Sequence, residues 1–153
     1  MTTELDRPDR VLLAGADGFL RLARTWIAWD GRPRVHRDGG RIYTPHKAVR
    51  RYADHLLDHL AQVEALLGGV QARPDGWHGS LVTLDSDWAR FREADVVEAT
   101  ERITRLSQTF ALRLLAAGEV EWDRPRGEQW TLREIADHVA RPWYAEQVGD
   151  LSS

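Results

Sequence analysis

Residues 54–62 read Asp-His-Leu-Leu-Asp-His-Leu-Ala-Gln and lie inside a long run with helical periodicity. The run begins at Thr44, a favourable N-cap residue, with Pro45 at the first helical position, and it stops at Gly68 and Gly69. Apolar side chains recur along it every three or four residues, at Ala48, Val49, Tyr52, Leu56, Leu60, Val63 and Leu67. We therefore predict one long amphipathic helix, around which the remaining elements pack.

Two histidines stand four residues apart in this helix. At that spacing the imidazoles of His55 and His59 project from one face, one turn apart, and they fall beside the apolar positions. Arg51, Asp54 and Asp58 fall on the polar flank. We therefore expect both histidines to point inward, close enough to share a metal ion.

Three further helices are predicted from the same periodicity, and no segment gives a clear strand pattern. They cover residues 11–29, 95–118 and 131–148, and Gly15 and Gly18 weaken the first of them. Capping pairs mark two of the starts: Asp95 with Glu98, and Thr131 with Glu134. Four helical segments favour an all-α fold, a four-helix bundle.

Long loops are predicted after the first and second helices. Residues 30–43 contain several glycines and a proline and predict a loop with a small hairpin around Asp38-Gly39. Residues 70–93 form a longer connection, with a short helical turn around 87–91. Loops of this length in a small domain often cover a functional site.

The composition is that of a globular protein. The chain has 153 residues, so residues 1–153 are predicted to form a single domain. The net charge of −3, with 21 basic and 24 acidic residues, gives no reason to expect a nucleic-acid or membrane partner. No apolar run approaches the roughly 20 residues of a membrane span, and the N-terminus lacks a signal-peptide pattern, so the predicted location is the cytoplasm.

Cysteine is absent, and this limits the chemistry. Any metal must be held by histidine and carboxylate, and any thiol must come from outside the chain. His138 adds a third helical histidine on the apolar side of residues 131–148. Three neutral imidazoles with one open position suit a catalytic divalent ion such as zinc or nickel. The alternative is that the histidines lie at the edge of the core and bond to carboxylates: Asp54, Asp58 or Asp137.

Other candidates are weaker. Trp77, His78 and Trp88 in the long connection are candidates for a pocket wall, although a surface position explains His78 more simply. Glu134 stands four residues before the third histidine but is better explained as a capping residue. Glu146 lies two turns beyond that histidine, within reach of a site there. Residues predicted to face solvent are His36, His46 and the charged segments Arg50-Arg51 and Glu101-Arg102.

Two stretches resemble the motifs of a known family. Residues 127–138, Gly-Glu-Gln-Trp-Thr-Leu-Arg-Glu-Ile-Ala-Asp-His, are similar to the "Trp-Ser/Thr, helix, His" signature of the DinB/YfiT-like superfamily, in which the histidine is one metal ligand. Residues 54–62 resemble the family's His-x-x-x-His-x-x-Gln helix, which supplies the other two. The resemblance implies a DinB-like four-helix bundle with the metal ligands His55, His59 and His138.

The order of the two motifs is exchanged relative to the family, where the tryptophan motif comes on the second helix and the histidine pair on the fourth. A bundle with near two-fold internal symmetry would still bring the three imidazoles together. An alternative alignment takes His59 as the early family histidine and His138 as the first of the late pair. Pro142 then occupies the last ligand position and the site is broken. His55 is a ligand only under the first alignment.

The resemblance also implies a function. Characterised members include metal-dependent transferases that use small thiols such as bacillithiol or mycothiol, and a related isomerase. For this chain the implied activity is a metal-dependent thiol S-transferase acting on an electrophilic small molecule, with its catalytic residues unassigned. The alternative, from another class, is a catalytically silent bundle that acts as a binding or stress-associated module, with a homodimer formed through a helix face as one option.

Overall fold

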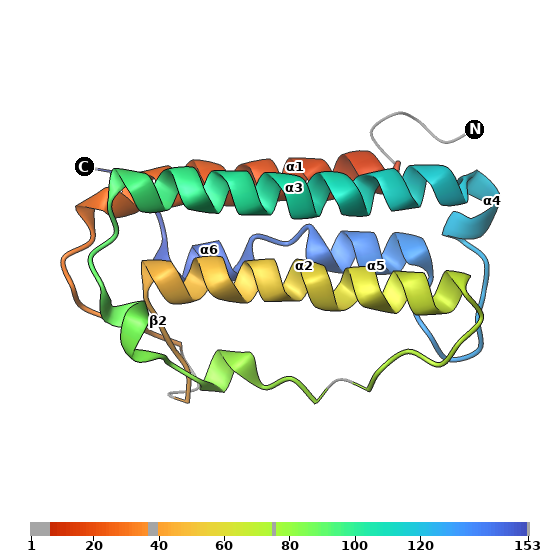
Figure 1. Cartoon of the computed structure of the whole chain (residues 1–153), viewed down its shortest axis with the longest axis horizontal. Helices are drawn as coiled ribbons and strands as arrows, with labels where there is room; N and C mark the ends of the chain where they lie inside the picture. The colour runs from red at the N-terminus through yellow and green to blue at the C-terminus, as the bar shows by residue number, and fades with distance from the viewer. Residues whose placement is uncertain (1–6, 37–39, 75, 153) are drawn as a thin grey trace.

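The computed structural model describes residues 7–36, 40–74 and 76–152, which are mostly helical with one two-stranded sheet (Figure 1). The α-helices are α1 (Pro8–Ala23), α2 (Pro45–Leu67), α3 (Glu93–Ala117), α4 (Glu119–Trp122), α5 (Leu132–Val139) and α6 (Trp143–Val148). Short 3-10 helices are η2 (Arg24–Ala28), η3 (Gly79–Leu81) and η4 (Asp85–Trp88). The strands are β1 (Arg34–Val35) and β2 (Ile42–Tyr43). No helix in the described part is long and apolar enough to cross a bilayer.

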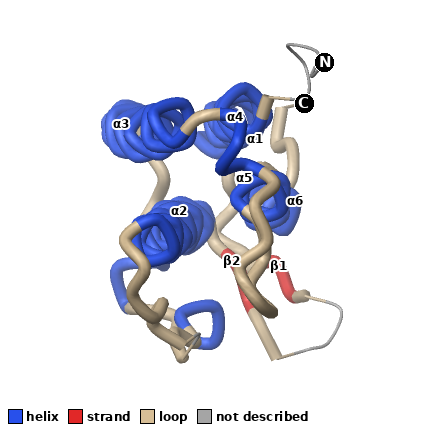
Figure 2. The backbone as a smooth tube through the Cα atoms, turned by 90° about the vertical axis from the view of Figure 1, so that its right-hand side faces the viewer, coloured by secondary structure: helices blue, strands red, loops and turns tan. Residues whose placement is uncertain are grey.

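Four helical rods lie along one axis: α1, α2, α3 and the α5–α6 pair (Figure 1). Seen end on, they stand at four corners, with α3 beside α1 and α2, and α5–α6 completing the square (Figure 2). Between them lies a core that includes Leu12, Phe19, Trp26, Tyr52, Leu56, Ile103, Phe110, Leu114, Leu132, Ile135 and Val139. The described residues are therefore mostly helical, as predicted, and most of the core lies between the helices.

The connection from α2 to α3 determines the direction of α3. After Leu67 the chain returns along the length of α2 before it enters α3, so α2 and α3 run in the same direction (Figure 1). Parallel neighbours need a long crossover, which explains the length of the predicted loop. The crossover contains η3 and η4 and lies along one side of α2. It therefore forms the outer wall of any site on that side of α2.

The start of α2 is as predicted. The Thr44 hydroxyl accepts a hydrogen bond from the Lys47 backbone N–H at 3.2 Å, and Pro45 occupies the first turn. Thr44 also donates its hydroxyl hydrogen to the carbonyl of Asp87 in the crossover. A cap of this kind contributes about 1 kcal/mol. The bond to Asp87 fastens the crossover to the first turn of the helix that carries the histidine pair.

The predicted fourth helix is divided in two. The Thr131–Glu134 capping box is confirmed, with the Glu134 N–H 3.1 Å from the Thr131 hydroxyl. The helix ends at Val139, however, and a new one begins at Trp143. Pro142 is the cause, because proline lacks an N–H and disfavours helical geometry in the residue before it. His138 consequently lies in the last turn of α5.

The start of α3 was predicted wrongly. Asp95 is the third residue of the helix rather than its cap, and its carboxylate accepts a bond from the Arg92 N–H at 2.8 Å. Glu98 pairs instead with Arg102. The polar pair at 95 and 98 fits a capping pattern, but the capping contact lies one turn earlier and is one-sided: the Asp95 carboxylate accepts from the Arg92 N–H, and the Arg92 side chain, a donor only, returns no bond.

Other elements begin or end a few residues away from their predicted boundaries. The first helix begins at Pro8, ahead of the predicted residue 11, and its predicted last part is the 3-10 segment η2. The short turn predicted at 87–91 is η4, Asp85–Trp88. The predicted hairpin forms, with β1 antiparallel to β2 and Arg34 opposite Tyr43. Its expected turn at Asp38-Gly39 lies outside the described residues.

Candidate metal centre

The three helical histidines meet at one place between α2 and α5. One ring nitrogen from each of His55, His59 and His138 lies within 4.8 Å of the others. The ring centroids are 4.6 Å apart for the α2 pair, and His138 is 4.8 and 4.9 Å from its two neighbours. A tetrahedral zinc ion with bonds of 2.0–2.1 Å holds nitrogens about 3.3 Å apart, which small side-chain rotations here would reach. The three residues are therefore close enough to bind a metal ion.

His55 is uncharged in this setting. Burial lowers its pKa to about 3, and the neighbouring His59 and His138 and the guanidinium of Arg51 act in the same direction. A metal ion binds the neutral form of imidazole, because the proton occupies the same lone pair. His55 is thus kept in the form that a metal requires across the physiological pH range.

His59 is oriented by a neighbour on its own helix. Its Nδ1 lies 2.8 Å from the side-chain oxygen of Gln62. An amide oxygen can only accept, so Nδ1 carries a hydrogen in this contact, which in the neutral ring leaves the lone pair on Nε2 for a metal. Gln62 in turn donates to the side chain of Gln129, within the stretch 127–138 that ends at His138, at 3.4 Å. Such an outer hydrogen bond is the usual partner of a metal-binding histidine.

The alternative prediction was that the histidines bond to the carboxylates of Asp54, Asp58 or Asp137. Asp54 pairs with Arg51 at 3.4 Å, and Asp58 lines the cavity beside the histidines. Burial raises the pKa of Asp54, and the nearby Arg51 and Arg50 lower it only in part. Asp137 is exposed on α5. The hydrogen bond that the structure describes for the α2 pair runs from His59 to an amide rather than to a carboxylate.

The histidines line a cavity of about 350 Å³ between α2, the crossover and the last segment of the chain. Aromatic rings form much of its wall. Trp130 lies 4.9 Å from the ring of His138 and is nearly parallel to that of His59, while Tyr144 lies 5.4 Å from His55. Such a cavity has room for a small molecule next to the three imidazoles. A second cavity, of about 560 Å³, adjoins it and shares Asp58, His59 and Trp130.

Arg51 and Tyr144 were not predicted as site residues. Arg51 was assigned to a solvated face, but its side chain is buried and lines the cavity. The hint in the sequence was its position four residues before His55, which places both on one side of the helix. Arg50 is also held, by Asp87 of the crossover at 2.7 Å. The prediction of a solvated Arg50-Arg51 segment was therefore wrong.

Three residues of the crossover were predicted as candidates for a pocket wall, and two of them line the cavity. Trp77 and His78 line it, whereas the half-exposed Trp88 does not. Glu134 is occupied by its capping bond, and Glu146 is exposed on α6.

The two remaining histidines, His36 and His46, were predicted to face solvent, but both are partly buried. His36 packs against Trp143 with ring centroids 5.4 Å apart. His46 lies 3.2 Å from the Arg90 carbonyl and 3.7 Å from Asp95. Both lie outside the cavity that holds the three histidines.

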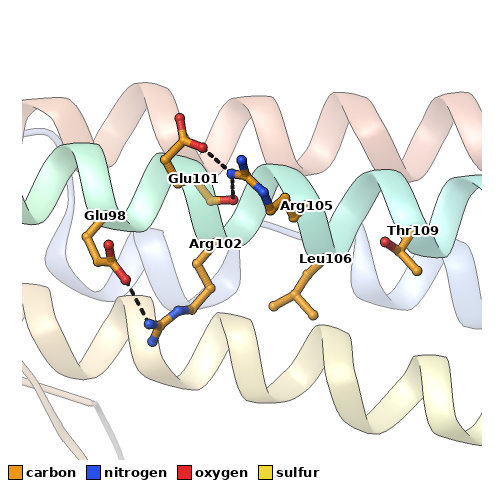
Figure 3. A pocket seen from close by; sticks show the side chains of 6 residues that line it. All are labelled: Glu98, Glu101, Arg102, Arg105, Leu106 and Thr109. Carbon is orange, nitrogen blue, oxygen red and sulfur yellow. Dashed lines mark hydrogen bonds and ion pairs between the residues drawn. The ribbon is translucent and has the colours of Figure 1, made fainter.

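A different kind of hollow lies on α3, lined by Glu98, Glu101, Arg102, Arg105, Leu106 and Thr109. Figure 3 shows its charged side chains pairing along the helix, Glu98 with Arg102 and Glu101 with Arg105. Both pairs are well exposed, as predicted for the Glu101-Arg102 segment. Exposed pairs of this spacing contribute only a few tenths of a kcal/mol, and none of the residues that line the hollow is a histidine.

Comparisons of the chain with protein-family models, with curated proteins and with solved structures found no match. The interpretation of the centre therefore rests on its geometry and on the two motifs.

Proposed function

We propose that the protein binds one divalent metal ion, zinc or nickel, through His55, His59 and His138, and that it is a four-helix-bundle enzyme of the DinB/YfiT-like type. Its proposed reaction is transfer of a low-molecular-weight thiol, of the mycothiol or bacillithiol kind, to an electrophilic small molecule. The observation that supports this most strongly is the convergence of three imidazoles, one of them held neutral, on a cavity. The absence of cysteine fits a nucleophile brought in by a cosubstrate.

The donor set fits such an ion. Three imidazoles leave at least one position open for a further ligand, which is the arrangement of catalytic rather than structural zinc sites. A divalent ion in this position would lower the pKa of a coordinated thiol and so supply a nucleophile near neutral pH. In this proposal Gln62 fixes the ring of His59, and Trp130 and Tyr144 restrict the access of water to the open side.

Metal content tests the proposal. The untagged protein is expressed with zinc and nickel in the medium, purified without chelators, and analysed by inductively coupled plasma mass spectrometry. We expect close to one ion per chain, and a large loss of metal in His59→Ala. His46→Ala is the matched control, because it removes a partly buried histidine from the same helix outside the cavity.

Two results would overturn the proposal. One is a metal content well below one ion per chain in the unaltered protein. The other is a content that His59→Ala leaves unchanged while both variants remain folded by circular dichroism. Either result would favour the catalytically silent binding module. The thiol is tested separately, by adding candidate thiols to the cobalt-loaded protein and recording the thiolate-to-metal absorption band.

A further inference from the structure

Arg51 is a buried cation within the same cavity. Its side chain is only 8% exposed, and it stands four residues before His55 on α2, about 6 Å along the helix axis. It lines the cavity together with the three histidines. A guanidinium is rarely buried without compensating partners, so the groups around it indicate what it is placed to bind.

The hydrogen bonds that Arg51 makes to the described residues leave part of its capacity unused. Nε donates to the Ser80 hydroxyl at 3.2 Å, Nη1 to the Asp54 carboxylate at 3.4 Å, and Nη2 to the Tyr144 hydroxyl at 3.4 Å. These bonds use three of its five N–H groups, and all are long. The neighbouring Arg50 differs, because it lies 2.7 Å from the carboxylate of Asp87.

The crossover is shaped around this guanidinium. A Cβ atom on Gly79 would stand 2.7 Å from Nη1 of Arg51 and 3.0 Å from its guanidinium carbon, so a larger residue at this position would displace the guanidinium. The rings of Trp77 and Tyr144 lie 5.8 and 5.5 Å from the guanidinium carbon. These contacts hold the planar group in one orientation before any ligand arrives.

The charge of the cavity favours an anion once a metal is present. Its charged lining consists of Arg41 and Arg51 against Asp54 and Asp58, which cancel formally. A divalent ion at the histidines would make the total positive. A guanidinium with free N–H groups in a fixed plane matches the two oxygens of a carboxylate.

We propose that Arg51 is an anion-binding residue, which holds the carboxylate of a small ligand whose metal-binding atom reaches the histidine cluster one helical turn away. The proposal rests on the metal centre proposed above and names the chemical class of its ligand. The ligand is a small molecule with a carboxylate at one end and a donor such as a thiol a few bonds away. Arg51 binds and orients this molecule and takes no part in bond making.

Two thiols of equal chain length test this assignment on the cobalt-loaded protein. We use 3-mercaptopropionate and 3-mercaptopropanol, and follow the thiolate-to-cobalt absorption band as each is added. The expected result is at least about tenfold tighter binding of the acid, since charge-assisted hydrogen bonds in a partly buried site are strong. Equal affinities for the two thiols would overturn the proposal and leave the metal centre standing.

Substitutions test whether Arg51 causes the preference for the acidic thiol. Arg51→Gln should remove the preference for the acid and leave cobalt and the neutral thiol bound. Arg50→Gln is the matched control, because it breaks the adjacent arginine's ion pair outside the cavity. Gly79→Ala keeps the charge but displaces the guanidinium, and it should weaken binding of the acid severalfold. If Arg51→Gln does not fold, Gly79→Ala alone decides, and an unchanged preference there overturns the proposal.

The cobalt spectrum without thiol separates the two proposals. If no cobalt binds at the histidines, the proposed function fails. The anion site is then judged on the metal-free protein, by nuclear magnetic resonance titration with propionate against propanol. Saturable shifts of the Trp77 and Tyr144 signals with propionate, lost in Arg51→Gln, would support the site, and their absence would refute it.

Discussion

Gly15 of α1 lies against the backbone of Ala140, so closely that a Cβ atom on Gly15 would stand 2.3 Å from the Ala140 carbonyl oxygen. Ala140 is the C-cap of α5, two residues after His138. The glycine that weakens the first predicted helix therefore allows the end of α5 to approach α1. This close packing fixes the position of the turn that carries the third histidine.

Gly15→Ala should therefore destabilise the protein by about 1–3 kcal/mol, the usual cost of forcing extra atoms into a packed contact. Gly18→Ala is the matched control in the same helix, because a Cβ there meets nothing closer than 4.0 Å. It should stabilise the protein by up to about 1 kcal/mol through helix propensity. Urea unfolding measures both, and equal effects of the two substitutions would contradict the close contact.

Acid should destabilise the metal-free protein through His55. The pKa of His55 is lowered to about 3 in the folded chain and is about 6.5 in the unfolded chain. Between these values the unfolded chain binds a proton that the folded chain does not. The free energy of unfolding should thus fall as the pH drops from about 6.5 towards 3, by up to about 1.4 kcal/mol per pH unit.

Urea unfolding in the presence of a chelator, from neutral pH to about pH 4, measures this slope. His55→Gln should flatten it, whereas His46→Gln should leave most of it in place. If the slopes of the unaltered protein and of His55→Gln coincide, the pKa of His55 is not lowered in the folded chain and the prediction is wrong.

Gln62 should control the affinity for the metal without binding it. Gln62→Leu removes the acceptor for the ring hydrogen of His59, so zinc affinity should fall about 10–100-fold, as for other outer hydrogen bonds. Gln62→Glu keeps an acceptor and should retain most of the affinity. Competition with a chromophoric chelator gives the values. Gln108→Leu, on the exposed face of α3, is the control and should match the unaltered protein.

Trp130 should report metal binding by its fluorescence. Its ring lies 4.9 Å from that of His138, so a paramagnetic ion such as Ni²⁺ at the histidines should quench its emission. Trp130→Phe should remove much of the nickel-dependent quenching. Trp88→Phe is the control, because Trp88 is equally exposed, 44% against 43%, but lies away from the cavity. Equal residual quenching in both variants would place the ion elsewhere.

The parts of the structure that could be predicted depend on local signals. The start and end of α2 follow from Thr44, Pro45 and a glycine pair, and its inward histidines follow from period and spacing. The Thr131 capping box is equally local. The break between α5 and α6 was missed because Trp143 and Val148 continue the apolar pattern after Pro142, and both pack into or against the core.

Arg51 could not be predicted from such signals. Its spacing places it on the side of His55, but an arginine there is usually solvated, and its burial depends on the crossover returning over α2 with a glycine at the point of contact. The approach of His138 to the histidine pair of α2 also depends on tertiary packing. The family motifs suggested it, and local spacing gave only the two histidines of α2.

The parallel course of α2 and α3 has a consequence for how the chain folds. Among the described residues, the extensive helix contacts join α1 to α3 and α5, and α2 to α3, α5 and α6, whereas α1 and α2, which follow one another, stand at diagonal corners. No compact hairpin of consecutive helices can therefore form first. High contact order slows folding, so this protein should fold more slowly than an up-and-down bundle of the same length.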